Sequence, residues 1–346
     1  MRFVRNQWYV AGWSYEFDGP MQRRELLGEP VVLFRREGRL HALQDRCPHR
    51  LLPLSQGRLT DAGLQCGYHG MTFAPDGRCV AIPGQDRIPP NARVRAFPVR
   101  ESHGICWIWM GDPALADEQP VFTLPQFGDP GWAMHQGAPI RYRTHYINLA
   151  ENLCDPAHVT FVHPGTLGSG SAGEDIPVDC HREGDVIVTS RWIRNSEPIG
   201  LFRAFDGFTG LVDRWHYYYF HAPATAVIDF GSEVSERDIQ PDERHTGFQI
   251  FAVHFLTPVD ATTTVDYWLH LRNRLQDDAD VSRRMNTALT AAFEEDRAVL
   301  EAIQCEQDRL GDSAPTVRLA IDKGPTLLRR AIDERLAAES QAEAGS

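Results

Sequence analysis

Two stretches, Cys47-Pro48-His49-Arg50 and Cys66-Gly67-Tyr68-His69-Gly70, decide how the first part of this 346-residue chain folds. Each stretch offers one thiolate and one imidazole, and sixteen residues, 50–65, separate His49 from Cys66. This ligand set suits a 2Fe–2S cluster, because one iron can take both sulfurs while the other takes both imidazoles. The proline and the glycine inside the stretches fit tight turns, which would bring backbone N–H groups close to the cluster sulfurs.

A tetrahedral zinc ion is the alternative occupant, since the same four ligands could hold it. Zinc sites more often pair like ligands within a loop, as Cys-x-x-Cys and His-x-x-x-His, whereas each loop here mixes the two. The spacing therefore favours the iron–sulfur cluster. The chain has seven cysteines, and an odd number in a chain this long argues against a disulfide framework.

The residues around these loops predict an all-β module. Short β-rich runs at 31–34, 40–43 and 105–109 are bounded by Gly and Pro, with a turn signal at 75–78. Residues 111–130 are rich in Pro, Asp and Gly and make the best linker. We therefore expect a first domain over 1–112 and a second over 113–336. The small, polar tail 337–346 is expected to fray.

Composition narrows the possible partners and locations. The formal charge of −12 argues against nucleic acid, because phosphate binding needs a basic surface. No apolar run is long enough to cross a bilayer. The N-terminus has no long apolar stretch followed by a small-residue cleavage site, so we expect a cytoplasmic protein without a membrane partner.

A second group of candidate ligands lies downstream, at His158 and His163. Histidines five apart turn through about 140° on a regular helix, so they converge only if the helix bulges or ends between them. Taken alone, such a pair would more often be two ordinary, partly buried histidines. A mononuclear non-haem iron would also require one carboxylate on the same face of the metal.

The clearest helical pattern, residues 283–310, offers that carboxylate. Asp296 falls near the middle of its apolar stripe, with Glu295 at the edge of the stripe and Glu294 on the opposite side. The stripe comprises Met285, Leu289, Ala292, Phe293, Val299, Leu300 and Ile303. A carboxylate there must be paired or bound to metal, and helix geometry alone leaves open whether Asp296 meets an Arg, a His or an iron.

Taken together, these motifs resemble the oxygenase components of Rieske non-haem iron oxygenases. The two loops match the C-x-H … C-x-x-H motif and lack the extra cysteines of the quinol-oxidising branch. The mononuclear iron motif N-x-x-D-x-x-H-x-x-x-x-H is carried by Asn152, Asp155, His158 and His163. The helix around Asp296 and the stretches 6–11, 82–85 and 107–112 are similar to the branch of vanillate and dicamba O-demethylases and toluenesulfonate methyl-monooxygenase.

The resemblance implies an α+β chain. Its N-terminal all-β Rieske domain would precede a catalytic helix-grip (START/Bet v1-like) domain with an antiparallel sheet and a long C-terminal helix. Cys47, His49, Cys66 and His69 would hold the 2Fe–2S cluster, and His158, His163 and Asp296 one Fe(II).

Two further roles follow from the resemblance. Asn152 would lie near the iron. Asp155 would bridge His69 of a neighbouring subunit to His158, as an electron-transfer residue within a homotrimer. Capping of the turn before Pro156 is the alternative role for Asp155.

The resemblance also implies the reaction. A terminal oxygenase of this branch uses O₂ and supplied electrons to hydroxylate, or O- or N-demethylate, an aromatic compound. NAD(P)H would act indirectly, through a separate reductase with or without a ferredoxin, because the chain shows no Gly-rich dinucleotide fingerprint. Ring cis-dihydroxylation is the alternative reaction, and a Rieske electron carrier or a zinc-stabilised binding protein is the alternative class.

The substrate pocket is the least determined part of the sequence. The stretches 215–221 and 248–254 carry aromatic and apolar residues suited to a flat substrate. His254 could donate a hydrogen bond to a substrate carboxylate or hydroxyl. A core or surface histidine on a strand is an equally good interpretation of His254.

Overall fold

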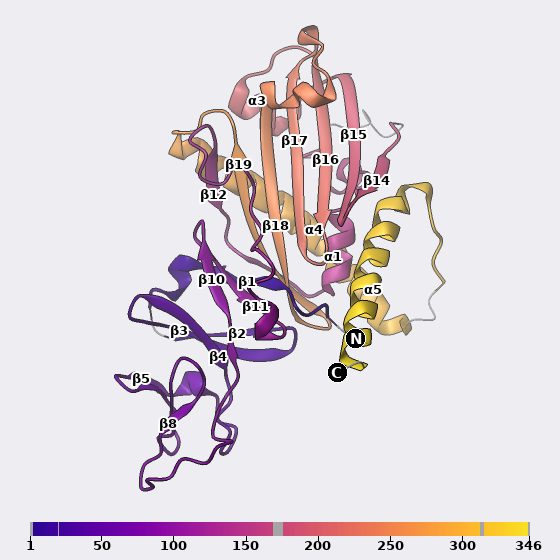
Figure 1. Cartoon of the computed structure of the whole chain (residues 1–346). Coiled ribbons are helices and arrows are strands. Elements are labelled where there is room, and N and C mark those ends of the chain that lie inside the picture. The colour runs from indigo at the N-terminus through magenta and orange to yellow at the C-terminus, as the bar shows by residue number, and fades with distance from the viewer. Residues whose placement is uncertain (1–2, 20, 169–175, 312–314, 345–346) are drawn as a thin grey trace. The chain divides into compact units, whose positions relative to one another are not determined.

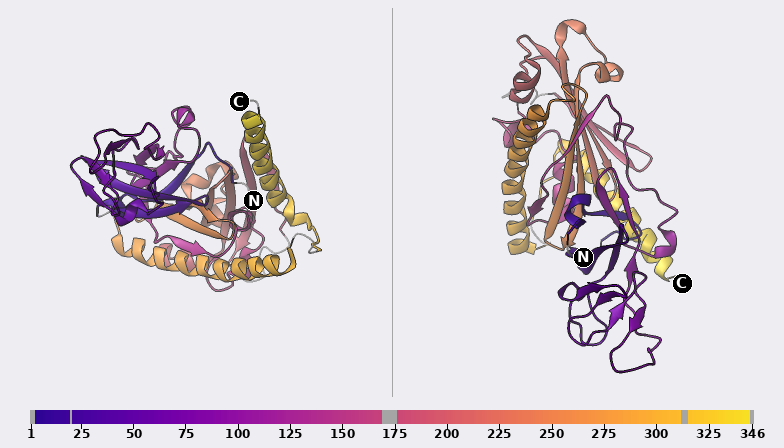
Figure 2. Two further views of the ribbon diagram at one scale, coloured as in Figure 1. Left: turned by 90° about the horizontal axis from the view of Figure 1, so that it is seen from below. Right: turned by 90° about the vertical axis from the view of Figure 1, so that its left-hand side faces the viewer.

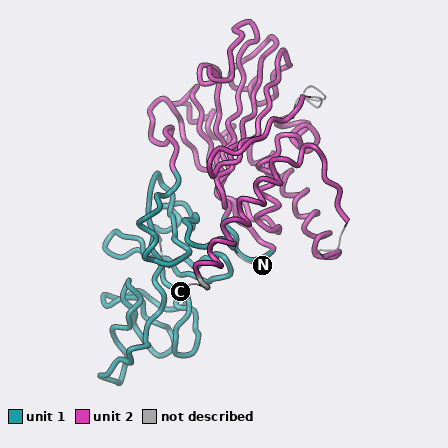
Figure 3. Tube along the Cα trace, turned by 45° about the vertical axis from the view of Figure 1, so that its right-hand side comes forward, with its two compact units in different colours: residues 1, 3–122, 257–261 teal, residues 2, 123–256, 262–346 magenta. Residues whose placement is uncertain are grey.

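The computed structural model describes residues 3–19, 21–168, 176–311 and 315–344 and divides the chain into two compact units. Figure 3 colours them separately. The first unit comprises residues 3–122 and 257–261, and the second comprises 123–256 and 262–346. Within the described residues, no helix is long and apolar enough to span a membrane.

The first unit is all-β, as predicted, and is built from three small sheets. The first sheet has the order β1-β11-β10 and the second β2-β3-β4-β9, and the third is the meander β5-β6-β7-β8. The strands of the first sheet are β1 (Trp8–Trp13), β10 (Val99–Ser102) and β11 (Ile105–Trp109). Those of the second are β2 (Gln22–Leu26), β3 (Glu29–Arg36), β4 (Arg39–Gln44) and β9 (Ala96–Phe97). The third contains β5 (Arg58–Thr60), β6 (Gly63–Gln65), β7 (Thr72–Phe73) and β8 (Cys79–Ala81).

The boundary of this unit lies ten residues beyond the predicted residue 112, at 122. The segment after β11 is held to the first unit by side chains. Trp8 Nε1 donates to the carbonyl of Gln119, and Arg100 forms an ion pair with Asp117. Composition marked this segment as a linker because its Pro and Gly residues interrupt regular structure, but such residues can still be fixed by tertiary hydrogen bonds.

The second unit contains an antiparallel sheet of eight strands. Its order is β12-β19-β18-β17-β16-β15-β14, with β13 also paired to β19. The short strands are β12 (Ala133–Gln136), β13 (Ile140–Tyr142) and β14 (Asp179–Glu183). The long ones are β15 (Val186–Ser196), β16 (Val212–His221), β17 (Thr225–Val234), β18 (Phe248–Asp260) and β19 (Thr263–Arg272).

The helix predicted over 283–310 is α4 (Ala279–Leu310), which lies along one face of this sheet (Figure 2). It begins where the Asp278 side chain accepts hydrogen bonds from two backbone N–H groups, and it ends at Gly311, whose φ is 66°. Phe293 packs edge-on against Trp268 of β19, with ring centroids 4.9 Å apart. The buried stripe is therefore the contact with the sheet.

The predicted stripe is wrong at its C-terminal end. Val299 and Ile303 are 40% and 42% exposed, whereas Gln304 is buried. The Gln304 side chain accepts a hydrogen bond from the backbone N–H of His145, 2.7 Å away, which compensates its burial. Polar contacts rather than apolar packing hold this last part of α4.

Three of the remaining helices contact α4, and the last one contacts the edge strand β14. They are α1 (Tyr146–Asn152), α2 (Val159–Val162), α3 (Gly200–Asp206) and α5 (Lys323–Ala344). Helix α5 contacts α1, β14 and β15, with Leu328 and Ile332 fully buried. The tail that we expected to fray from residue 337 is described as helix up to Ala344, and residues 345–346 lie outside the described residues. The Ala, Glu and Gln residues there are strong helix formers.

Candidate metal centres

The first candidate centre lies in the first unit, where two loops face each other. Cys47 and Cys66 are 2% and 3% exposed, whereas His49 and His69 lie at the surface. The two imidazole centroids are 4.6 Å apart. All four side chains line one small cavity, together with Arg50, Leu52, Tyr68 and Met71. Two inner sulfurs and two outer imidazoles fit a cluster whose irons have different ligands.

The backbone of these loops shapes the cavity as the sequence predicted. The N–H groups of His49 and Arg50 donate to the Cys47 sulfur, while burial raises the pKa of the Cys47 thiol. A side chain at position 67 would bring its Cβ within 2.8 Å of the Gln56 carbonyl oxygen, so glycine is required there. Backbone donors to the sulfur would stabilise a bound thiolate and raise the potential of the cluster.

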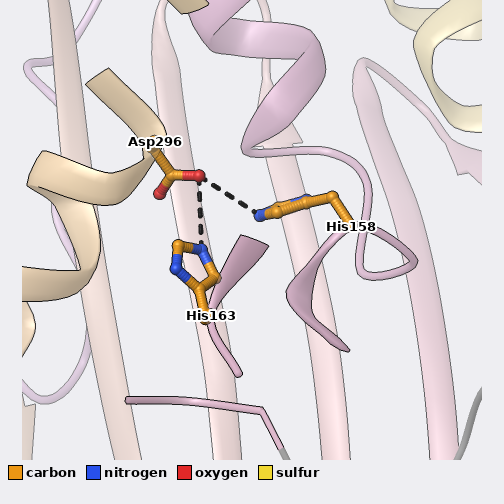
Figure 4. Close-up of side chains that lie close together, drawn as sticks. All are labelled: His158, His163 and Asp296. Atoms are coloured by element: carbon orange, nitrogen blue, oxygen red, sulfur yellow. Dashed lines mark ion pairs between the residues drawn. The ribbon is translucent and has the colours of Figure 1, made fainter. Parts of the chain in front are cut away.

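The second candidate centre lies in the second unit and joins two helices (Figure 4). Helix α2 is only four residues long, with His158 just before it and His163 just after it. Because the helix ends between the two histidines, their Nε2 atoms converge on Asp296 of α4. His158 Nε2 is 3.5 Å and His163 Nε2 is 3.2 Å from Asp296 Oδ1. Within the described ranges, this trio is the one group of His, Cys, Asp or Glu close enough to share a metal ion.

The opposite nitrogens of both imidazoles are held by other groups. His158 Nδ1 bonds the backbone carbonyl of Asp155, and His163 Nδ1 bonds Glu295 Oε2 at 2.8 Å. Thr166 Oγ1 donates to the same Glu295 oxygen. These contacts fix the ring orientations and turn Nε2 of each histidine toward Asp296, as shared binding of a metal would require. Sequence reasoning placed Glu295 at the edge of the apolar stripe but missed this contact.

Asp296 is 4% exposed and is oriented by a neighbour from the predicted motif. Asn152 Nδ2 donates to Asp296 Oδ1 at 2.9 Å. Burial alone would raise the pKa of Asp296, but the hydrogen bond from His163 and the charge of both histidines hold it below its usual range. The carboxylate is therefore ionised and ready to bind a cation. Iron(II) fits two imidazoles and one carboxylate with open positions.

A cavity opens beside the trio. Apolar side chains make most of its wall, namely Leu153, Val159, Leu167, Ile199, Ile228, Phe230, Ala252, Leu289 and Phe293. The polar side chains on it are Asn152, His216, Tyr218 and the trio itself. The predicted stretches 215–221 and 248–254 both contribute, through β16 and β18.

His254, the predicted substrate contact, does not line this cavity. Its Nδ1 bonds Asp266 Oδ2 at 2.7 Å, and the side chain is 1% exposed. The Phe293 ring, 4.7 Å from the imidazole and on the cavity wall, covers it. The structure thus agrees with the core alternative for this histidine.

Asp155 lies outside the cavity beside His158 and is half-buried. Its Oδ1 accepts a hydrogen bond from the backbone N–H of Ala157 at 2.7 Å, so the turn-capping contact is present. Two surface concavities both include Asp155 and His158 in their walls. The Asp155 carboxylate therefore has a face toward the exterior in addition to its cap.

Comparisons with known proteins cover nearly the whole chain. Residues 7–98 match the Rieske [2Fe-2S] domain, and residues 142–338 match the vanillate O-demethylase oxygenase C-terminal domain. A putative iron–sulfur subunit of a toluene-4-sulfonate monooxygenase system from Comamonas testosteroni is 39% identical over 97% of this chain and 98% of its own. The oxygenase component of chloroacetanilide N-alkylformylase from Rhizorhabdus wittichii is 34% identical, with coverage of 98% and 97%.

The fold agrees with a solved structure. Dicamba monooxygenase bound to 3,6-dichlorosalicylic acid superimposes with a TM-score of 0.88, at 28% identity and over 98% of this chain and 99% of the other. A further structure of that enzyme, with non-haem iron and dicamba, gives a TM-score of 0.83.

Proposed function

This chain belongs to the Rieske non-haem iron oxygenases with a vanillate O-demethylase-type C-terminal domain, and on that basis we propose that it hydroxylates or demethylates an aromatic compound as a terminal oxygenase. It is an oxidoreductase whose cofactors are a Rieske 2Fe–2S cluster and one mononuclear iron. Cys47, His49, Cys66 and His69 are the proposed cluster ligands, and His158, His163 and Asp296 the proposed iron ligands.

The observation that carries the proposal is the position of the trio on the wall of an apolar cavity. Iron bound there supplies O₂ activation at the positions that the three ligands leave open. The apolar wall holds a flat substrate next to that point and excludes water from it. Asn152 keeps Asp296 in place, so we assign it a positioning role. An electron carrier or a zinc protein would need neither this cavity nor the trio.

The proposed demethylation consumes one O₂, two electrons and two protons per methoxy group. One oxygen atom enters the methyl C–H bond, and the other leaves as water. The resulting hemiacetal breaks its C–O bond to give formaldehyde and a phenol. N-Demethylation follows the same balance through a carbinolamine, and methyl hydroxylation stops at the alcohol.

Electrons are supplied from outside the chain. We propose a separate NAD(P)H-dependent reductase, with or without a ferredoxin, and a cytoplasmic location close to that donor. We also propose a homotrimer, in which Asp155 links His69 of one subunit to His158 of the next. The exposure of His69 and the place of the half-buried Asp155 on the walls of two surface concavities support this route.

A single-turnover experiment tests the proposed function. The iron-loaded protein is reduced chemically, exposed to O₂ with a panel of methoxyarenes, and assayed for formaldehyde and phenol. We expect about three irons per chain, a reduced cluster with low average g-value, and formaldehyde that depends on both iron and O₂. A diol from an unmethylated arene without formaldehyde would establish cis-dihydroxylation instead. Zinc in place of iron would refute the oxygenase.

The charge of the substrate is left open by family membership. The compounds in the names of two relatives differ in charge. Toluene-4-sulfonate is an anion, whereas a chloroacetanilide is uncharged. The charge of the substrate must therefore be inferred from the cavity of this chain.

A further inference from the structure

We propose that the cavity beside the iron site takes an uncharged aromatic compound, whose neutral polar group is held between His216 and Tyr218 of β16. This inference rests on the proposed function, because it names the class of substrate for the same site. It excludes aromatic carboxylates and sulfonates as preferred substrates.

The first support is the state of the two β16 side chains. His216 and Tyr218 are two residues apart on one strand, so they face the same side of the sheet, and their ring centroids are 6.2 Å apart. They are 8% and 4% exposed, and both line the cavity. Across the described ranges, neither the imidazole nor the phenol hydroxyl has a hydrogen-bond partner. Buried polar groups are nearly always paired, so a bound molecule is expected to complete them.

The second support is the absence of a cation from the described cavity wall. The one charged residue apart from the histidines is Asp296, a carboxylate. Outside the described ranges the sequence contains a single cation, Arg2. A carboxylate or sulfonate entering this cavity would lose its hydration and gain only neutral donors, which do not compensate a buried charge.

Two buried arginines lie near His216 but do not reach the cavity. Arg214 Nε donates to Ser196 Oγ at 2.8 Å. Arg191, the cross-strand neighbour of His216, lines the surface concavity beside Asp155. Burial, with added repulsion from these two arginines, lowers the pKa of His216 to about 3. The imidazole is therefore neutral and offers one donor and one acceptor, as the Tyr218 hydroxyl does.

This pair of groups matches the chemistry of an amide, a phenol or a sulfonamide. Each of these can donate to one partner and accept from the other without carrying a charge. A purely apolar arene would leave both side chains unpaired, and an anion could accept but not donate. The two side chains therefore favour a neutral polar arene over a purely apolar arene and over an anion.

Matched pairs of ligands test the inference on the iron-loaded, cluster-containing protein under anaerobic conditions. The pairs are 4-methoxybenzamide with 4-methoxybenzoate, and toluene-4-sulfonamide with toluene-4-sulfonate. Isothermal titration calorimetry should give dissociation constants at least tenfold lower for the uncharged member of each pair. Equal or tighter binding of the anions, or no saturable binding of either uncharged member, would overturn the inference.

A matched pair of variants tests the assigned residues. Tyr218→Phe should weaken binding of 4-methoxybenzamide about tenfold, because it removes one hydrogen bond and leaves the ring. Tyr217→Phe, on the opposite face of the same strand, should leave the dissociation constant unchanged. Unchanged binding in Tyr218→Phe would overturn the anchoring role. Failure of the proposed function would look different, since the ligands would bind while reduced protein and O₂ gave no product from any of them.

Discussion

At the scale of single residues, two adjacent carboxylates of α4 have different partners. Asp296 faces the Nε2 atoms of both histidines, whereas Glu295 bonds Nδ1 of His163 and has no contact with His158 among the described interactions. A carboxylate on the far nitrogen of a metal-binding histidine fixes its tautomer and increases its basicity. Glu295 thus orients His163 as a ligand for the metal that Asp296 would also bind.

Removal of the Glu295 carboxylate should weaken iron binding. We expect Glu295→Ala to reduce the affinity for the mononuclear iron by about 10- to 100-fold, whereas Glu295→Gln, which can still accept from Nδ1, should lose much less. Iron content after dialysis against buffered Fe(II) measures this, and the cluster absorbance should stay constant. Glu294→Ala is the control, because Glu294 pairs with Arg297 on the other side of α4. Equal iron content in Glu295→Ala and Glu294→Ala would contradict the role.

Asp155 combines a structural contact with the proposed electron-transfer role, and Asn can separate the two. Asp155→Asn keeps an oxygen that accepts from the Ala157 N–H but loses the charge. We expect normal content of both metals and turnover lowered by at least about 100-fold, since electrons no longer reach the iron. Iron analysis and the rate of cluster reoxidation in stopped flow measure this. Near-normal turnover would show that the residue only caps the turn.

Some residues of the two sites can be predicted from the sequence, whereas others cannot. The four proposed cluster ligands are marked by their own spacing along the chain. The three proposed iron ligands are marked only by the family motif together with the apolar stripe of the helix. Glu295, His216 and Tyr218 could not be assigned in this way, since their roles depend on which strand faces which helix. His254 was favoured by its place in an aromatic stretch. Only tertiary packing reveals that Phe293 covers it.

At the scale of elements, the shortness of α2 and the length of α4 together create the iron site. Helix α2 places its two flanking histidines together because it ends after four residues. Helix α4 presents Asp296 because its apolar stripe is anchored on the sheet around Phe293. The sequence predicted α4 but left open whether a helix ended between the two histidines. It also took 337–346, which includes the last part of α5, for a polar tail.

The anchoring of α4 gives a stability prediction. Phe293→Ala should destabilise the second unit by about 3–5 kcal/mol, because the ring is buried against Trp268 and leaves a cavity. The thermal midpoint followed by circular dichroism should fall by roughly 6–20 °C for a unit of this size. Val299→Ala on the exposed side of the same helix is the control and should change the midpoint by no more than about 2 °C. A similar shift in both variants would contradict this account of the helix anchor.

At the scale of the whole molecule, the chain carries its two metal sites in two different compact units. Each site is built entirely from residues of its own unit. From the sequence we expected two domains that divide at residue 112, whereas the first compact unit extends to residue 122. The segment 113–122 joins the first unit through hydrogen bonds and ion pairs, and the hairpin tip 257–261 joins it through contacts such as that of Thr257 Oγ1 with the Val10 carbonyl. Such long-range contacts leave no local pattern in the sequence.

The proposed trimer predicts that two inactive variants can restore activity when they assemble together. A variant without cluster, Cys47→Ser, and a variant without iron, Asp296→Ala, should each be inactive alone. If the cluster of one subunit serves the iron of the next around a closed ring, mixed trimers contain productive pairs. Every mixed trimer has one productive pair among its three chains, so purified mixed trimers should show about a third of the activity per chain.

Co-expression with two different affinity tags, followed by tandem purification, isolates the mixed assemblies for this measurement. Formaldehyde release under reductase-coupled turnover is the readout, and the two variants mixed after separate assembly are the control. Activity in the co-expressed sample alone would establish transfer between subunits. If co-assembled and separately assembled samples are equally inactive while both retain their remaining metals, electrons must pass within one chain. Asp155 would then have to connect the two units of a single subunit.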